Sequence, residues 1–136
     1  MLSNVLANSV NLFHILVIIF MIVVPFTESK ILHVLHAMLG LLLILHWVTN
    51  EDACSLTTLE GYLRGIPASE SFIGQFVRPL FNVTSNESCI IIYIFTGFLT
   101  SVSLSKLLSD PLFIDIFSGS GNNTAFYKFK IFLIQK

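Results

Sequence analysis

The side chains best suited to cofactor or redox chemistry in this chain are histidines and cysteines. They are His14, His33, His36, His46, Cys54 and Cys89. Imidazole nitrogens ligate haem iron, and two thiols can alternate between the reduced and the disulfide form. Ionisable groups inside apolar segments are functional candidates by default. The residue types therefore suggest a haem- or thiol-based redox site. His14 and His36 would be its ligands, and Cys54 and Cys89 its redox pair.

The spacing of the histidines argues against haem binding. Haem ligands must stand on opposed helices, and a hairpin that turns near Pro25 would place His14 level with about Leu41. His36 is then about five residues away, which is roughly 7 Å along a helix. Neutral imidazoles bonded to nearby carbonyl groups explain the pattern better, so the sequence predicts no cofactor. His14, His33 and His36 remain only candidates for cofactor binding. The chain also lacks a C-x-x-C motif, which argues against a metal site.

Cys54 and Cys89 allow a disulfide bond. The bond would close a loop of about 36 residues and stabilise the fold by about 4 kcal/mol in the chain-entropy model. Whether it forms depends on the redox state of the compartment, so the sequence leaves both states open. A nucleophilic Cys54 is less favoured, because the sequence places no histidine beside it unless His46 approaches in the fold.

The composition indicates which solvent surrounds the elements that carry these residues. The chain has 136 residues, of which 54% are hydrophobic and 11% charged, against about 25% charged in ordinary soluble domains. A helix of about 20 apolar residues crosses the roughly 30 Å core of a bilayer. We therefore predict an all-α integral membrane protein with three transmembrane helices at about 5–24, 31–48 and 89–108. The net charge of −1 argues against a nucleic-acid partner.

Two connections and a tail organise the predicted helices. The short break at 25–30 predicts a tight turn and an antiparallel transmembrane hairpin. Residues 49–88 are rich in polar side chains and would form an interfacial lid, so that 1–108 make one transmembrane bundle. Residues 109–136 form a flexible linker and a tail whose alternating apolar residues favour a strand or a surface-lying segment. The excess of lysine on the side of the tail places the C-terminus in the cytoplasm.

A polar cluster begins the predicted lid. Thr57 and Glu60 fit a capping box, T-x-x-E, at the start of a short interfacial helix at about 58–64. Glu60 and Arg64 stand four residues apart, which is the spacing of an ion pair on one helix face. A second short interfacial helix is predicted at about 70–77. Each charge of the cluster therefore has a local structural explanation.

The same cluster carries a motif, H-W-x-x-N-x-x-x-C-x-L-T-x-x-E-x-x-L-R. Its residues other than leucine are His46, Trp47, Asn50, Cys54, Thr57, Glu60 and Arg64. His46 and Trp47 also suit the headgroup region at the end of the second helix. Over about 33–80 the chain resembles a family of small multi-pass membrane proteins of unknown function, seen in bacteria and in large nucleocytoplasmic DNA viruses. Ser55 stands where that family usually has proline, and the family's fourth span is missing or degraded after Leu108. The resemblance implies architecture and a setting in a virion's internal membrane, not a reaction.

We predict a structural or interaction role rather than an enzyme. Local geometry accounts for the polar cluster without a substrate. The partners would be the lipid bilayer and a membrane or capsid-type protein bound through 49–88 or through the tail at 125–136. Two alternatives stay open. One is the haem- or thiol-based redox protein described above, and the other is an interfacial enzyme that uses His46, Glu60 and Arg64.

Overall fold

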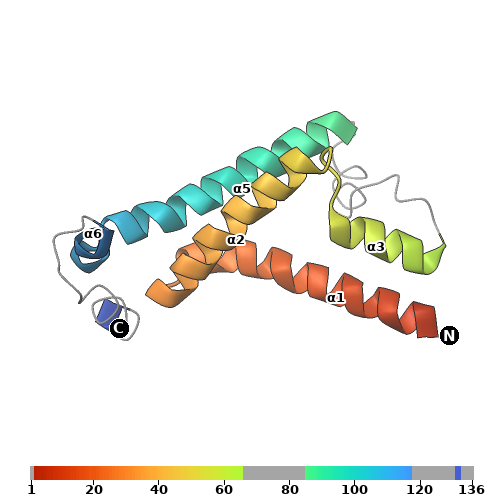
Figure 1. The fold of residues 1–136 in the computed structure, drawn as a ribbon, viewed down its shortest axis with the longest axis horizontal. Helices are drawn as coiled ribbons and strands as arrows, with labels where there is room; N and C mark the ends of the chain where they lie inside the picture. Colours follow the sequence, from red (N-terminus) through yellow and green to blue (C-terminus); the bar gives the residue numbers. More distant parts are fainter. Residues whose placement is uncertain (1, 66–84, 118–130, 133–136) are drawn as a thin grey trace.

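The computed structural model describes residues 2–65, 85–117 and 131–132. The elements are α1 (Leu2–Val23), the 3-10 turn η1 (Val24–Phe26), α2 (Lys30–Thr49), α3 (Ser55–Arg64), α5 (Ser85–Leu108) and α6 (Pro111–Phe117). Figure 1 shows them in the order of the chain. Among the residues described there is no strand, which confirms the predicted all-α class.

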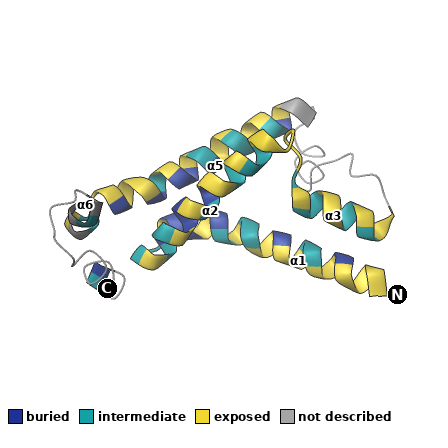
Figure 2. Ribbon diagram, viewed as in Figure 1, coloured by how far each residue is buried: buried dark blue, intermediate teal, exposed yellow. Residues whose placement is uncertain are grey.

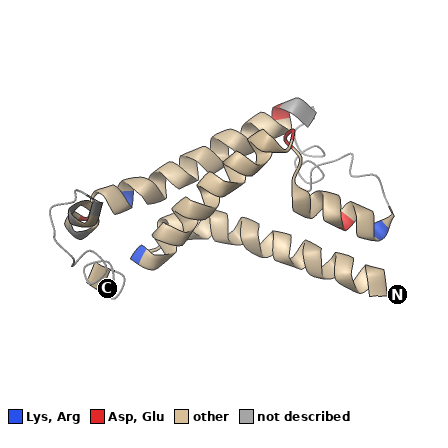
Figure 3. Cartoon of the chain, viewed as in Figure 1, with Lys and Arg blue, Asp and Glu red and all other residues tan. Residues whose placement is uncertain are grey.

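Three helices are long and apolar enough to cross a membrane. They cover Leu2–Phe26, Lys30–Thr49 and Glu87–Leu108, close to the predicted spans. Figure 3 shows that the charged residues of the described segments lie near the helix ends and on α3, while the central parts of α1, α2 and α5 carry none. This arrangement is compatible with an integral membrane protein.

The packing buries several polar side chains and leaves many large apolar side chains exposed. The buried polar side chains include His14, His33, His36, Thr96, Thr100 and Ser103. The exposed large apolar side chains include Leu12, Leu16, Leu41, Leu42, Ile94 and Phe98. Figure 2 shows exposed positions along the outer sides of all three long helices. A water-soluble domain has the opposite arrangement, so the exposed surface of these helices suits lipid.

The three long helices and α3 associate in two pairs. α2 packs along α5, whereas α1 packs along α3 and meets α2 mainly near the turn that joins them. In Figure 1, α1 diverges from α2 beyond that turn. The predicted antiparallel hairpin is therefore wrong away from the turn. The reason is that lipid is as apolar as the helix surfaces, so helix pairing in a membrane follows small and polar side chains instead.

The α2–α5 pair rests on small and hydroxyl residues. At Gly40, an added Cβ would overlap with the Thr100 side chain, so the two backbones approach where α2 has no side chain. Further along, His33 Nδ1 lies 3.3 Å from Ser103 Oγ, which is buried. Small and hydroxyl residues let helices approach one another in a membrane, and the contact between α2 and α5 is where those of α5 do so.

Residues 131–132 pack against the start of α2 and the end of α5. Phe132 is fully buried beside Ala37 and Leu107, and the ring of Phe113 lies 5.5 Å from the ring of Phe132. Within the predicted tail, only residues 131–132 are described, and they are helical rather than extended. The predicted helix at 70–77 lies outside the described residues. α6 was not predicted, although its proline at the first helical position is a common helix start.

Candidate functional site

The motif residues meet at the corner between α2 and α3 and along the face of α1. At the corner, Asn50 Nδ2 donates to the carbonyl of Ala53 at 2.8 Å, and the N–H of Asp52 donates to the carbonyl of Trp47 at 2.9 Å. Glu51 and Asp52 have φ values of 50° and 62°, which few residues other than glycine adopt. The Asn50 side chain therefore supports a strained reversal that turns the chain from α2 into α3.

His46 binds the first residue of α3. Its Nε2 accepts from the backbone N–H of Ser55 at 3.3 Å and lies 3.1 Å from Ser55 Oγ. Because Nε2 accepts, the ring proton sits on Nδ1. A helix begins with N–H groups that lack helical partners, and His46 satisfies one of them. His46 was predicted as an interfacial anchor, but in the structure it joins α2 to α3.

The predicted capping box is wrong. α3 begins at Ser55, and its N-cap is Cys54, which makes no side-chain capping bond. Thr57 therefore lies inside the first turn, and Glu60 bonds elsewhere. The physical reason is that His46 supplies the missing partner, so the helix can start earlier than Thr57. The predicted end of α3 is confirmed, since Gly65 adopts the left-handed conformation at φ 68°.

Glu60 and Arg64 form the predicted ion pair, with Arg64 Nε 2.9 Å from Glu60 Oε1. Both also bind α1. Asn11 Nδ2 donates to the two carboxylate oxygens of Glu60 at 3.1 and 3.3 Å, and Arg64 Nη2 donates to Asn8 Oδ1 at 3.0 Å. The Glu60 side chain is 14% exposed. We call the contacts of Asn8, Asn11 and His14 with α3 the α1–α3 seam.

Because of the α1–α3 seam, α3 is oriented differently from the interfacial helix that the sequence predicted. Its charged side chains point to α1, while Leu59 and Tyr62 are 45% and 82% exposed. The sequence did contain a signal for this packing, because Asn8, Asn11 and His14 follow one another at three-residue spacing in an otherwise apolar helix. Residues at that spacing share a helix face, and polar groups in a span seek partners.

Cys54 lies against His14 at the end of the seam. Cys54 Sγ is 3.8 Å from His14 Nε2, and His14 is buried. Burial raises the pKa of the Cys54 thiol, but the interactions of the thiol with His14 and with nearby Thr57 outweigh burial and lower the pKa to about 7. The sequence had offered His46 as the only neighbour for this thiol. The neighbour is His14, which lies 40 positions away in the chain.

The proposed disulfide is not formed in the structure. Cys54 and Cys89 are both free thiols, and each is half-buried. Whether they pair under oxidising conditions stays a prediction.

The other two histidines of the spans have separate structural partners. His33 Nε2 lies 3.0 Å from the carbonyl of Thr27, and His36 Nε2 lies 3.0 Å from the carbonyl of Met21. These contacts follow the expectation of imidazoles bonded to carbonyl groups. The structure does not bring His14 and His36 to a shared site, since His14 faces α3. Within the described ranges, no group of three or more His, Cys, Asp or Glu residues could hold a metal ion.

Trp47 and Tyr93 connect the corner to α5. Their rings pack edge to face with centroids 5.5 Å apart, and Tyr93 Oη donates to Asp52 Oδ1 at 2.6 Å. The corner is thus held by α5 as well as by α1 and α3. Comparison of the chain with known protein families, with curated proteins and with solved structures finds no match.

Proposed function

We propose that this chain is a small integral membrane protein with a structural or interaction role. The observation that carries the proposal is that the polar motif is used within the fold. Glu60 and Arg64 bind each other and α1, His46 binds Ser55, and Asn50 holds the corner. Because these side chains bond to other parts of the protein, they stabilise its fold, and few polar groups are left to bind a substrate.

The same proposal includes a setting and a partner. The motif's resemblance favours the internal membrane of a large DNA virus particle, and the lysine distribution favours a cytoplasmic C-terminus. The outer face of α3 is a suitable contact surface for a membrane or capsid-type protein, because Tyr62 and Leu59 are exposed there. Aromatic side chains are enriched at protein interfaces.

Site-specific photo-cross-linking in the native membrane tests this role. A photoreactive residue at Tyr62 should give one discrete adduct that mass spectrometry identifies as a membrane or capsid-type protein. The matched position is Leu42, which is 59% exposed in the middle of α2 and should react with lipid. Adducts with lipid alone at both positions would contradict a protein partner on α3.

A thiol-based redox role is the second candidate, and the contact between Cys54 and His14 favours it. A thiol with a pKa of about 7 is half ionised at neutral pH, and the thiolate is the reactive form. In this function Cys54 and Cys89 would alternate between two thiols and a disulfide, passing two electrons to an external thiol–disulfide partner. Mass spectrometry of the chain after mild oxidation in membranes should then show loss of two hydrogens. The Cys89→Ser variant should not show it.

A further inference from the structure

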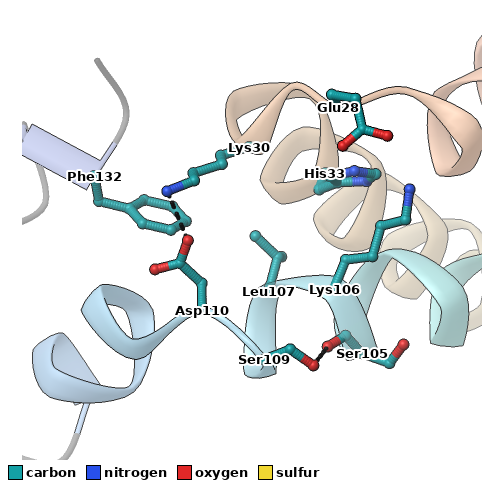
Figure 4. Close-up of a pocket in the computed structure, with 9 residues that line it drawn as sticks. All are labelled: Glu28, Lys30, His33, Ser105, Lys106, Leu107, Ser109, Asp110 and Phe132. Carbon is teal, nitrogen blue, oxygen red and sulfur yellow. Dashed lines mark hydrogen bonds and ion pairs between the residues drawn. The ribbon is translucent and has the colours of Figure 1, made fainter. Parts of the chain in front are cut away.

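A polar cavity of about 360 Å³ lies where α2 begins and α5 ends. Its lining residues are Glu28, Lys30, His33, Ser105, Lys106, Leu107, Ser109, Asp110 and Phe132. Figure 4 shows them converging from the turn, α2, the end of α5 and the tail. The volume falls within the range of small-ligand sites, about 300 to 1,000 Å³. Because these residues stand at the ends of two candidate spans, the cavity would open at the level of lipid headgroups.

Several lining groups are already engaged. Lys30 Nζ is 2.6 Å from Asp110 Oδ2 and lies over the Phe132 ring at 5.3 Å. His33 has a partner at each ring nitrogen, with Nε2 next to the Thr27 carbonyl and Nδ1 next to Ser103 Oγ. These contacts form the walls of the cavity and hold the turn between α1 and α2 in place.

Two opposite charges remain available to a ligand. Lys106 Nζ donates to the carbonyl of Thr27 at 3.1 Å, which leaves two of its three N–H groups. Within the described segments, Glu28 is exposed and has no hydrogen bond or ion pair. Figure 4 shows the Lys106 side chain extending toward the turn that carries Glu28, yet the two charges do not form an ion pair with each other.

The serines add acceptors to the same cavity. Ser105 Oγ donates to the carbonyl of Val102 at 3.2 Å, and Ser109 Oγ donates to the carbonyl of Ser105 at 2.8 Å. Each hydroxyl hydrogen is therefore used, and the oxygen lone pairs are left to accept. A ligand that donates several hydrogen bonds fits this arrangement, provided that it also carries an anion for Lys106.

We propose that this cavity binds the phosphoethanolamine headgroup of a membrane lipid, with the phosphate on Lys106 and the primary ammonium on Glu28. An anionic headgroup would meet Lys106 but would also face the carboxylate of Glu28. A choline headgroup carries its positive charge without N–H donors, so it cannot hydrogen-bond to Glu28 or to the serine oxygens. A phosphoethanolamine satisfies both charges, and Leu107 with Phe132 gives the cavity an apolar wall.

Native mass spectrometry of the delipidated full chain tests this site. The chain is mixed with phosphatidylethanolamine, phosphatidylcholine or phosphatidylglycerol of identical acyl chains, each at the same concentration. We expect phosphatidylethanolamine to bind about fivefold more tightly than either of the others, which is the upper end of the contribution of one solvent-exposed ion pair. Equal binding of the three lipids overturns the proposal. So does binding of water-soluble glycerophosphoethanolamine as tightly as of the lipid, since the ligand would then be a free headgroup.

Substitutions at Glu28 and Lys106 test which residue binds which end of the headgroup. Glu28→Gln should abolish the preference for ethanolamine over choline, and it should leave folding unchanged because Glu28 has no partner in the described residues. Lys106→Gln should weaken phosphatidylethanolamine and phosphatidylglycerol alike by about fivefold, and Lys106→Arg should restore binding. The matched control is Glu51→Gln, an exposed carboxylate at the other end of α2. An unchanged preference in Glu28→Gln, or its loss in Glu51→Gln, overturns the assignment.

Discussion

The two helix pairs of this molecule are held by different kinds of contact. Along α2 and α5, glycine and hydroxyl side chains let the backbones approach, and Gly40 faces Thr100. Along α1 and α3, amide and charged side chains form the bonds, and Glu60 joins Arg64 to Asn11. The first pair depends on shape and the second on specific polar partners. The first should therefore be sensitive to added volume, and the second to loss of a single charge.

The largest effect is expected at the α2–α5 contact. Gly40→Ala should lower the free energy of unfolding in detergent micelles by about 2 to 3 kcal/mol, because the new Cβ overlaps with a β-branched side chain that cannot move aside. Gly97→Ala is the control, since nothing lies within 4 Å of a Cβ there. Thr100→Ala should rescue Gly40→Ala. Equal stability of the two single glycine variants would contradict the close approach.

Glu60→Ala should come next, with a loss of about 1 to 2 kcal/mol. The substitution leaves Arg64 without its carboxylate and Asn11 without its acceptor, and a half-buried charge that loses its partner is destabilising. Chemical denaturation in micelles measures the loss. Leu59→Ala is the control on the same helix, because Leu59 is exposed on the outer face. A smaller loss for Glu60→Ala than for Leu59→Ala would mean that the α1–α3 seam does not stabilise the fold.

The thiol at the end of the seam gives a pH-dependent readout. With Cys89 replaced by serine, the rate of Cys54 alkylation should rise with pH and reach half its maximum near pH 7, since only the thiolate reacts. His14→Ala removes a hydrogen bond that favours the thiolate, so the midpoint should move up by about one to two pH units, toward an ordinary thiol at about 8.5. An unchanged midpoint would show that His14 does not contact Cys54.

The smallest effect is expected where the two pairs are joined. Tyr93→Phe removes only the hydroxyl that donates to Asp52 at 2.6 Å, and it keeps the ring that packs on Trp47. Because this hydrogen bond is exposed, we expect a loss of about 0.5 to 1 kcal/mol in thermal unfolding. A loss as large as that of Gly40→Ala would mean that the corner, rather than the α2–α5 contact, controls stability.

The sequence predicted the spans and not their pairing. Hydropathy identifies a segment that suits lipid, and each span is a local run of residues, so 31–48 was found close to its observed bounds of Lys30–Thr49. Pairing depends on contacts between distant residues. The assumption that α1 runs along α2 placed His14 level with Leu41, whereas its partner Cys54 is the N-cap residue of α3.

The site was predicted in part for the same reason. The ion pair of Glu60 and Arg64 lies within one helix turn and was foreseen from spacing. The start of α3 was not, because His46 supplies its capping contact from another helix. Asn8 and Asn11 were overlooked, although their three-residue spacing in an apolar helix marks a polar face. Patterns within one stretch of sequence therefore predicted the helices, whereas contacts between helices determine the geometry of the site.

The central claim is that α3 lies with its polar face on α1, and thiol cross-linking in membranes tests it most directly. His14→Cys, made with native Cys54 and with Cys89 replaced by serine, introduces a thiol facing Cys54. A short bifunctional maleimide should join positions 14 and 54 rapidly. Leu16→Cys, at a side chain that is 54% exposed, should give little product. Equal cross-linking from positions 14 and 16, or none from position 14, would contradict the α1–α3 seam.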